Sequence, residues 1–552
     1  MRISWVRRVV LGFLIFVMAS MPMFATEVNG EKKPLRANLT LMEMQYEHIE
    51  YAEVEHLMKE LDVIIQQDDK EAFYKWDETY YALYCKINTM IQVAQLKYQL
   101  HMEQIQYFDE YLYSIDLLGK MKSTYVELFE EEEETLSSDM TKYYELSVER
   151  AKLVDKYLEQ ELNTTIWVKD KELTLLQIIK DETIENGEFF KLYDEWYTAY
   201  NKATGEILLE LIKIDNQMAQ IQGYKTYVES AYASFNRDYT PQEIKVFIAN
   251  VKELIPDVFI SLYKSNLVSS SILEDYTYES DEHLLQTIRS GFITQNEKLL
   301  EAYDYMLKYG LYDIEARNDK VSGGFTTYFD EWAEPYIVIN YAAPYETALT
   351  MIHEFGHYYS YFAIGDNEGG LDLDETYSQA LELLAMPYYD KVLGDNKYSK
   401  DAEIHTVNNM LAAIIQGCLY DEFLQQVYEN PNMTVDKMND LYVQLAKDYG
   451  IKVDKRSWSN VTHNFQTPYY YISYSVSAVA ALELWAQSLE EGNGIESYLA
   501  LVTAGDSNSF IESIESVGLN NPLEKETLNT VIKAIKEYFD VSSKEQSHKK
   551  AA

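Results

Sequence analysis

The stretch EILLELIKIDNQMAQIQG, residues 206–223, shows the fold class most directly. Its apolar residues recur every three or four positions, at Ile207, Leu211, Ile214, Met218 and Ile221. Positions with this spacing share one face of an α-helix, so the pattern predicts an amphipathic helix with one buried stripe. Gly223 stands where such a helix is expected to end, because glycine readily adopts the left-handed conformation that follows helix C-termini.

The sequence around this helix contains few residues that break helices. No proline occurs between Pro34 and Pro241, and only four glycines interrupt that stretch. Proline removes a helical hydrogen bond and glycine weakens a helix interior, so the stretch favours long helices. Residues 51–67 show the same apolar spacing. We therefore predict a mainly α, multihelical protein whose N-terminal lobe, residues 26–225, is made entirely of helices.

The length of the chain indicates more than one hydrophobic core, and its net charge excludes some kinds of binding partner. The 552 residues exceed the roughly 250–300 residues at which a single hydrophobic core stops growing. A formal net charge of −44 repels phosphate backbones and anionic headgroups, so we expect no nucleic-acid partner and no acidic membrane surface. The two cysteines, Cys85 and Cys418, match no thiolate metal motif, and form either one disulfide or two buried free thiols.

The first residues have the order of a secretory signal. A basic start, MRISWVRR, precedes the apolar run VVLGFLIFVMASMPMFA, residues 9–25, after which the sequence turns polar. This order predicts a signal peptide over residues 1–25, a secreted or extracytoplasmic location, and no stable membrane insertion after its removal. The alternative is an uncleaved anchor, since the run approaches the roughly 17 residues that can just span a bilayer. The polar residues 541–552 are expected to form a flexible tail.

One segment departs from the helical pattern. GGFTTYFDEWAEPYIVIN, residues 323–340, begins with Gly323 and Gly324 and ends in a short β-rich run that starts on a proline. Because proline cannot donate to a β-ladder, we expect the run containing Tyr336 and Val338 to be an edge strand. Such an edge can accept an extended peptide through main-chain hydrogen bonds. A purely structural hairpin is the alternative.

The motif HEFGH follows within TALTMIHEFGHYYSYF, residues 347–362. Residues four apart share a helix face, so His353 and His357 can point two imidazoles at one metal ion. Glu354 is rotated by about 100° from His353, too far to join the same ligands but near enough to hydrogen-bond a water there, as a general base does. Two ordinary helical histidines are the alternative, so the motif needs a third ligand.

Candidates for that ligand lie in LDLDETYSQALELLAM, residues 371–386, at Asp372, Asp374, Glu375 and Glu382. Catalytic zinc with two histidines and one glutamate keeps its fourth position open. Glu375 and Glu382 are seven residues apart and share a helix face. Either of them can bind the metal while the other supports a histidine from behind.

A second cluster of polar side chains lies in THNFQTPYYYISYSVSA, residues 462–478. It contains His463, Tyr470, Tyr471 and Tyr474 around a proline. Imidazole and phenol groups are donors that can stabilise a tetrahedral oxyanion. In a chain with 49 tyrosines, packing is the alternative role.

Four passages, taken in order, resemble the thimet oligopeptidase and oligoendopeptidase F family of zinc metallopeptidases, most closely its oligoendopeptidase F branch. They are IQGYKTYVESAY with RDYTPQEI, PYIVINYAAPYETALTMIHEFGHYY, ETYSQALE and HNFQTPYYYISYS. The resemblance begins near residue 216. It implies a two-lobed ellipsoid with a deep channel, zinc on the channel floor, a small β-sheet beside the active-site helix, and a catalytic domain over residues 226–540.

The resemblance also implies roles for individual residues. His353, His357 and Glu375 become the ligands of one zinc ion per chain, and Glu354 the general base. The oxyanion and substrate-orienting positions fall on His463, Tyr471 and Tyr474. Tyr470, beside them, becomes a substrate-binding residue. The loop and strand that hold the peptide backbone correspond to Gly323, Gly324, Tyr336 and Val338.

We therefore predict a zinc-dependent endopeptidase that hydrolyses short oligopeptides, with such peptides as its partners. One alternative is an exported, non-catalytic oligopeptide-binding protein on the same scaffold, which would not need Glu354 or the tyrosines. Another is a zinc carboxypeptidase or dipeptidase, which would not cut peptides whose ends are blocked.

Overall fold

The structure is a computed structural model that describes residues 38–41, 43–44, 48–67, 70–101, 105–130, 138–181, 183–365, 370–394, 396–506 and 508–540. The predicted signal peptide and the predicted tail lie outside these residues. None of the helices in this described part of the chain combines the length and apolarity that crossing a bilayer requires. Cys85 and Cys418 are both free thiols, the first half-buried and the second buried.

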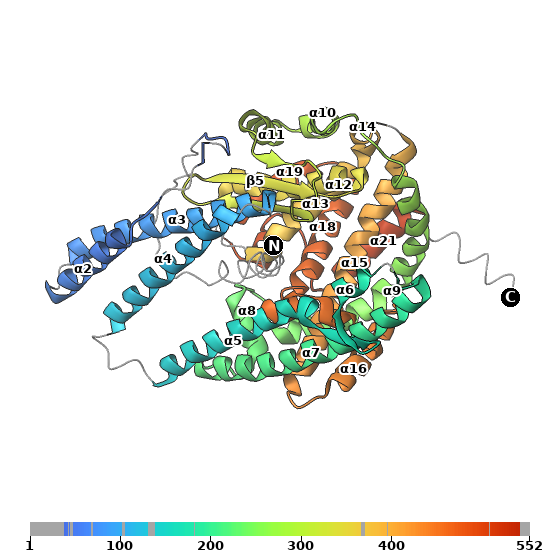
Figure 1. Cartoon of the computed structure of the whole chain (residues 1–552). Coiled ribbons are helices and arrows are strands. Elements are labelled where there is room, and N and C mark those ends of the chain that lie inside the picture. Colours follow the sequence, from blue (N-terminus) through green and yellow to red (C-terminus); the bar gives the residue numbers. More distant parts are fainter. Residues whose placement is uncertain are drawn as a thin grey trace.

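Long helices dominate the N-terminal part, as predicted. The segment 51–67 forms α2, and residues 206–221 form the second half of α7. The elements in chain order are α2 (Tyr51–Gln67), α3 (Lys70–Leu100), α4 (Ile105–Glu130), α5 (Ser138–Asn163), β1 (Thr165–Val168), β2 (Lys171–Thr174), α6 (Leu175–Ile179) and α7 (Asn186–Ile221). In Figure 1, α2 to α4 and the pair α5 and α7 form two groups of helices that diverge on the left of the view.

The prediction that this lobe is entirely helical is wrong, because β1 and β2 form an antiparallel hairpin. The β-branched and aromatic residues of TIWV suit a pleated strand. Lys169 and Asp170 make the two-residue turn, with φ of 46° and 69°. Positive φ at both positions is what a hairpin turn of this length requires, and it is usually supplied by asparagine or glycine. The absence of those residues explains why the turn was missed.

The rest of the chain forms a second, larger set of helices. They are α8 (Tyr227–Ser234), α9 (Pro241–Leu273), α10 (Asp281–Gly291), α11 (Glu297–Tyr309), α12 (Pro344–Ile364), α13 (Gly370–Ala385), α14 (Tyr389–Val392), α15 (Asn396–Glu429), α16 (Val435–Asp448), α17 (His463–Gln466), α18 (Ile472–Glu491), α19 (Gly494–Ala504), α20 (Phe510–Ser516) and α21 (Lys525–Tyr538), with three short 3-10 turns at Ile293–Gln295, Met386–Tyr388 and Ser457–Asn460. Helix α18 is almost wholly buried and packs against α13 and α15 in the centre of the molecule (Figure 1).

A three-stranded sheet lies against α12, as expected for a sheet beside the active-site helix. Its strands are β3 (Tyr312–Asp313), β4 (Gly323–Phe329) and β5 (Glu334–Asn340), in the spatial order β3-β5-β4. The predicted edge strand is therefore wrong: β5, with Tyr336 and Val338, is the buried central strand. The edge strand is β4, which contains Gly323 and Gly324 and has no strand partner on its outer side among the described residues.

The central strand tolerates Pro335 because of where its missing N–H group would point. Ile337 donates its N–H to the carbonyl oxygen of Leu311, on the β3 side of the strand. Pro335 stands two residues earlier, so its nitrogen faces the same side. Strand β3 pairs only with Ile337 and Val338 and ends before it reaches the proline. No ladder hydrogen bond is lost there.

A buried lysine fastens the loop that joins β3 to β4. The Lys320 ammonium donates to the carboxylate of Asp313 at 2.8 Å and to the carbonyl oxygens of Asp313, Glu315 and Ile339 at 2.8, 3.0 and 2.8 Å. The Lys320 side chain has no exposed surface. This single group therefore joins the loop to the ends of β3 and β5.

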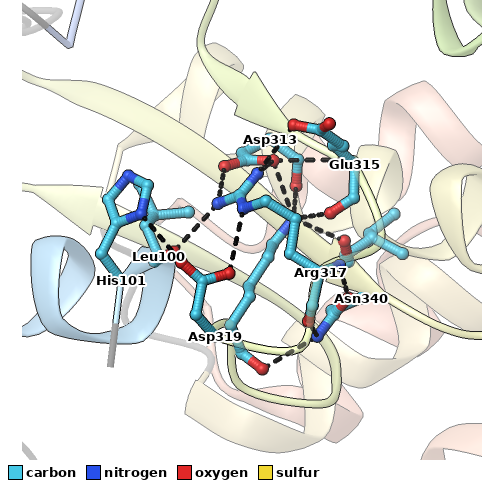
Figure 2. A network of polar contacts seen from close by, with 9 residues as sticks. Leu100, His101, Asp313, Glu315, Arg317, Asp319 and Asn340 are labelled. Carbon is cyan, nitrogen blue, oxygen red and sulfur yellow. Dashed lines mark hydrogen bonds and ion pairs between the residues drawn. The ribbon is translucent and has the colours of Figure 1, made fainter. Parts of the chain in front are cut away.

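Arg317 and Asn340 extend the network to the N-terminal helices (Figure 2). Asn340 accepts from the backbone N–H of Arg317 at 2.9 Å and donates to the carbonyl oxygen of Lys320 at 2.9 Å. The Arg317 guanidinium donates to the carbonyl oxygen of Leu100, the last residue of α3, at 2.9 Å. His101 lies 3.5 Å from Asp319. The position of edge strand β4 thus depends on one polar cluster that reaches from α3 to β5.

Replacing Lys320 with methionine is expected to lower the free energy of unfolding by about 3 kcal/mol, because the Asp313 carboxylate and three carbonyl groups lose their buried cation. Urea or thermal unfolding followed by circular dichroism measures the change. Lys298→Met is the matched control, since Lys298 is exposed on α11 and should change stability by less than about 0.5 kcal/mol. Equal effects of the two substitutions would contradict the structural role of Lys320.

Candidate active site

The HEFGH segment lies in the middle of α12. Pro344 opens this helix, and Gly365, with φ of 75°, follows its last residue. Phe355 and Tyr358 bury one side of the helix in the core. His353 and His357 share another side, with their ring centroids 5.1 Å apart. The four-residue spacing therefore brings the two imidazoles together as predicted.

Helix α13 approaches α12 unusually closely, at Gly356. A Cβ atom at this position would lie 2.5 Å from the Cα atom of Ser378 and 2.9 Å from the carbonyl oxygen of Tyr377. Real Cβ atoms essentially never come so close to another backbone. The glycine inside HEFGH is thus what allows the α13 carboxylates to reach the histidines, a role that the sequence analysis missed. A glycine in the middle of a helix was the available signal.

Three predicted ligands converge between these helices. One ligand atom each from His353, His357 and Glu375 lies within 4.8 Å of the other two. The Nε2 atom of His353 is 3.8 Å from Oε2 of Glu375, and its Nδ1 atom is 2.6 Å from Oε1 of Glu382. The two carboxylates thus divide the roles that their spacing left open: Glu375 joins the imidazoles and Glu382 supports His353 from behind. Asp372 instead accepts a hydrogen bond from Tyr239.

This donor set fits a zinc ion. Two imidazole nitrogens and one carboxylate oxygen are the protein ligands of catalytic zinc sites that keep one position open. The hydrogen bond from Nδ1 of His353 to Glu382 leaves Nε2 to face Glu375, which is the arrangement that orients a metal-binding histidine. His353, His357 and Glu375 could therefore hold one ion.

The electrostatics of the site suit a divalent cation. Burial lowers the pKa of His353, but Glu382, with smaller contributions from Glu354 and Glu375, raises it to about 10. Burial and the neighbouring His353 hold the pKa of His357 well below its usual value. Burial raises the pKa of Glu375. Three carboxylates thus surround two imidazoles in a partly buried site, an excess of negative charge that a bound cation would neutralise.

Glu354 is held by the edge strand rather than by α13. The hydroxyl of Thr326 lies 2.7 Å from Oε2 of Glu354 and 3.0 Å from its carbonyl oxygen. Gly324 makes room beside it, because a Cβ atom there would lie 3.0 Å from Oε1 of Glu354 and 2.6 Å from Thr350. Burial raises the pKa of Glu354 to about 7. Sequence reasoning missed Thr326, although it lies two residues after Gly324 and therefore on the same face of β4.

The tyrosine segment approaches Glu375 from α17 and α18. The ring of His463 lies 4.5 Å from the ring of Tyr470, and the rings of Tyr470 and Tyr474 are 5.6 Å apart, measured between centroids. After burial, the charge of Glu375 is among the factors that raise the pKa values of both tyrosines. Both hydroxyls therefore stay protonated and can donate. Burial lowers the pKa of His463 to about 4, so its imidazole is neutral.

Tyr471 belongs to the same cluster, with its ring centroid 5.3 Å from that of Tyr474, and it also contacts α15. Its ring lies 4.9 Å from Tyr420 on α15 and 5.2 Å from His463. Burial and the nearby Tyr442 raise its pKa, without a contribution from Glu375. Of the two adjacent tyrosines, Tyr470 is the one whose raised pKa includes a contribution from the charge of Glu375.

Arg237, from the RDYTPQEI passage, holds the tyrosine segment in place. Its guanidinium donates to the carbonyl oxygen of Tyr469 at 2.8 Å and to the hydroxyl of Ser473 at 2.9 Å. Tyr469 has a φ of 70°, a conformation that only a surrounding structure can impose on a bulky residue. The guanidinium also lies 3.9 Å from Asp372 of α13. Arg237 thus joins α13 to the turn that orients Tyr470.

Part of the chain is similar to a known peptidase family. Residues 296–531 match the family model of Peptidase family M3, and this range contains HEFGH, Glu375, Thr326 and the tyrosine segment. Oligopeptidase PepF of Bacillus subtilis (strain 168) is 24% identical over 388 residues, which are 64% of this chain and 57% of the relative. The chain therefore spans little more than half the length of that curated relative.

Solved structures agree with the fold. A crystal structure assigned to oligoendopeptidase F has a TM-score of 0.70 at 20% identity and covers 91% of this chain and 99% of its own. PZ peptidase A with an inhibitor has a TM-score of 0.69 at 19% identity, with coverages of 91% and 99%. The resemblance to the oligoendopeptidase F and thimet oligopeptidase family and the mainly helical fold are thus confirmed.

Gly356→Ala is expected to weaken zinc binding at least about tenfold, the scale on which displaced supporting groups act, because the added methyl must push α13 and Glu375 away from the histidines. Competition with a chromophoric chelator measures the affinity. Gly119→Ala is the matched control, since a Cβ atom at Gly119 of α4 meets no atom within 4 Å. An unchanged affinity in the Gly356 variant would show that the helix contact does not shape the site.

Proposed function

We propose that this protein is a zinc-dependent metalloendopeptidase that hydrolyses peptide bonds in short oligopeptides. The observation that carries the proposal is the convergence of His353, His357 and Glu375 from two helices, with Glu354 beside them. The match to Peptidase family M3 over the same residues supports the reaction class.

His353, His357 and Glu375 would hold one zinc ion per chain, with Glu382 orienting His353. When bound there, zinc would supply Lewis-acid polarisation of the scissile carbonyl group and would lower the pKa of a water molecule. The mixed imidazole and carboxylate ligands favour zinc over harder ions such as magnesium and calcium, which prefer oxygen ligands.

Glu354 acts as the general base in this proposal. Its Oε2 atom is occupied by the hydroxyl of Thr326, while Oε1 has no hydrogen-bond partner in the described part of the chain. Oε1 can therefore accept a proton from the attacking water and return it to the nitrogen of the leaving amine. Thr326 keeps the carboxylate in one orientation through both transfers.

Tyr470, Tyr474 and His463 are proposed to stabilise the oxyanion. In support, the charge of Glu375 contributes to the raised pKa values of both tyrosines, and the ring of His463 lies 4.5 Å from that of Tyr470. Donors that are already oriented stabilise charge as it develops, without reorganisation during the reaction. Tyr471, which contacts Tyr420, is proposed to pack this segment against α15 rather than to donate.

The edge of β4 is proposed to bind the peptide backbone. Gly323 and Gly324 open this strand, and its residues up to Tyr328 are half-buried. An extended peptide can pair with such an edge through main-chain hydrogen bonds that do not depend on its sequence. The same strand carries Thr326, so a bound peptide would lie beside Glu354. A secreted or extracytoplasmic location remains part of the proposal, based on residues 1–25.

Glu354→Gln is expected to reduce the turnover number by at least about 10²–10⁴, because proton transfer by a positioned base contributes on that scale. Cleavage of an internally quenched nonapeptide with both ends blocked measures the rate, and metal analysis should show about one zinc per chain in both proteins. Cleavage of this substrate by the parent protein separates an endopeptidase from a carboxypeptidase or dipeptidase. If both proteins hold zinc and neither cuts a varied peptide set, a peptide-binding protein becomes the better description.

Tyr470→Phe is expected to lower the turnover number by about 10²–10³ with little change in KM, because its hydroxyl is proposed to stabilise the oxyanion of the transition state rather than the bound substrate. Tyr471→Phe is the matched control, with an expected change of less than about twofold. Steady-state kinetics on the same blocked peptide distinguish the two residues. The reverse order of effects would return the oxyanion role to Tyr471.

A further inference from the structure

A cavity of about 210 Å³ lies between α5, α7 and the segment that precedes α17, outside the proposed catalytic machinery. Helices α5 and α7 run side by side in the lower part of Figure 1. Half of the residues that line the cavity are aromatic: Tyr157, Tyr193, Trp196, Tyr197 and Tyr200. The volume is below the roughly 300–1,000 Å³ of pockets for drug-sized ligands, so it suits a single side chain or a small molecule.

The aromatic wall is fixed by hydrogen bonds at its polar ends. The Tyr157 hydroxyl donates to the carbonyl oxygen of Ser459 at 3.1 Å, and the Trp196 indole donates to the carbonyl oxygen of Thr164 at 3.1 Å. Tyr157 and Trp196 are each 4% exposed, whereas Tyr193 is 38% exposed. The cavity thus has a rigid aromatic floor and one ring near solvent.

One carboxylate, Glu161, lines the same cavity, and no lysine, arginine or histidine does among the described residues. Glu161 is exposed and has no ion-pair partner in the part of the chain that the structure describes. Its charge reaches the aromatic floor: burial is the main reason that the pKa of Tyr200 rises to about 12, and Glu161 contributes to that rise. Glu161 thus gives the cavity a negatively charged lining beside aromatic rings, whose faces attract cations.

The same group of rings already binds a cation within the fold. The guanidinium carbon of Arg456 lies 4.4 Å from the ring centroid of Tyr197. This charge is balanced by Asp454 and Asp194, whose carboxylates lie 2.7 and 2.8 Å from the guanidinium nitrogens. Arg456 therefore leaves the negative character of Glu161 in place.

We propose that this cavity is a subsite for an organic cation, and specifically for a lysine or arginine side chain of the peptide substrate, an assignment that rests on the proposed function. A cation near aromatic faces gains roughly 0.5–2 kcal/mol, and the unpaired Glu161 would add to this. The net charge of −44 attracts basic peptides from a distance. Thr462, which also lines the cavity, directly precedes His463, so an occupied subsite would lie next to the candidate catalytic segment.

The test uses full-length Glu354→Gln protein, loaded with zinc, so that binding is measured without cleavage. End-blocked neutral nonapeptides carry one lysine or one norleucine at each position in turn, and calorimetry gives their affinities. We expect lysine at one position to bind about fivefold more tightly than norleucine, within the range of cation–aromatic contacts. Equal affinities of the lysine and norleucine peptides at every position would overturn the proposal.

Substitutions in the cavity locate the effect. Adding Glu161→Gln or Tyr193→Leu should remove most of the preference for lysine, and both positions are exposed enough to keep the fold. Glu195→Gln is the matched control, because Glu195 is an exposed residue of α7 that does not line the cavity. A preference for lysine that survives Glu161→Gln and Tyr193→Leu would place the cation elsewhere and overturn the proposal.

Two further experiments distinguish a peptide side chain from a free cation as the ligand, and the cavity proposal from the proposed function. In the first, the binding of tetramethylammonium is measured with and without Glu161→Gln. If this substitution abolishes the binding while lysine in the peptides has no effect, the cavity is a site for free cations and the substrate assignment is overturned. With the native Glu354, the control variant Glu195→Gln should cut the neutral peptide at the parent rate. If the parent fails to cut any peptide, the proposed function fails, but the lysine preference still decides whether the cavity binds cationic side chains.

Discussion

The contact between α12 and α13 at Gly356 is the constraint on which the candidate site depends. The histidines lie on one helix and the carboxylates on the other, so no metal site exists unless the two backbones nearly touch. Close-packed interiors do not deform freely, and a methyl group at this point must therefore separate the helices. The same contact brings Glu382 behind His353 and so fixes which imidazole nitrogen faces Glu375.

A second layer of contacts positions the groups that act around the metal ligands. Thr326 and Gly324 of β4 shape the surroundings of Glu354, and β4 in turn depends on the loop that Lys320 fastens from inside. That loop also binds the C-terminal end of α3 through Arg317. The edge proposed to bind peptides is therefore anchored to α3 as well as to β3 and β5, which gives the N-terminal helices a structural role beside the site.

The third part of the site comes from chain segments far apart in sequence. Arg237 holds the turn around Tyr469, and Tyr470 and Tyr471 follow directly from this turn. The aromatic cavity with Glu161 adjoins the segment that leads into His463. Residues that recognise the substrate and residues that react with it would then share one support, because the Ser459 carbonyl that anchors Tyr157 lies four residues before His463.

The sequence by itself determined the helical class, the shared face of His353 and His357, and the pair Glu375 and Glu382, because each of these follows from the geometry of a single helix. It misplaced β5 as an edge and missed the β1–β2 hairpin and Thr326, because strand order and contacts between elements have no local period. Only the tertiary structure decided that Glu375 joins the imidazoles and that Glu382 supports His353 from behind. Those outcomes depend on how separate elements pack, and packing is set by the whole core rather than by neighbouring residues.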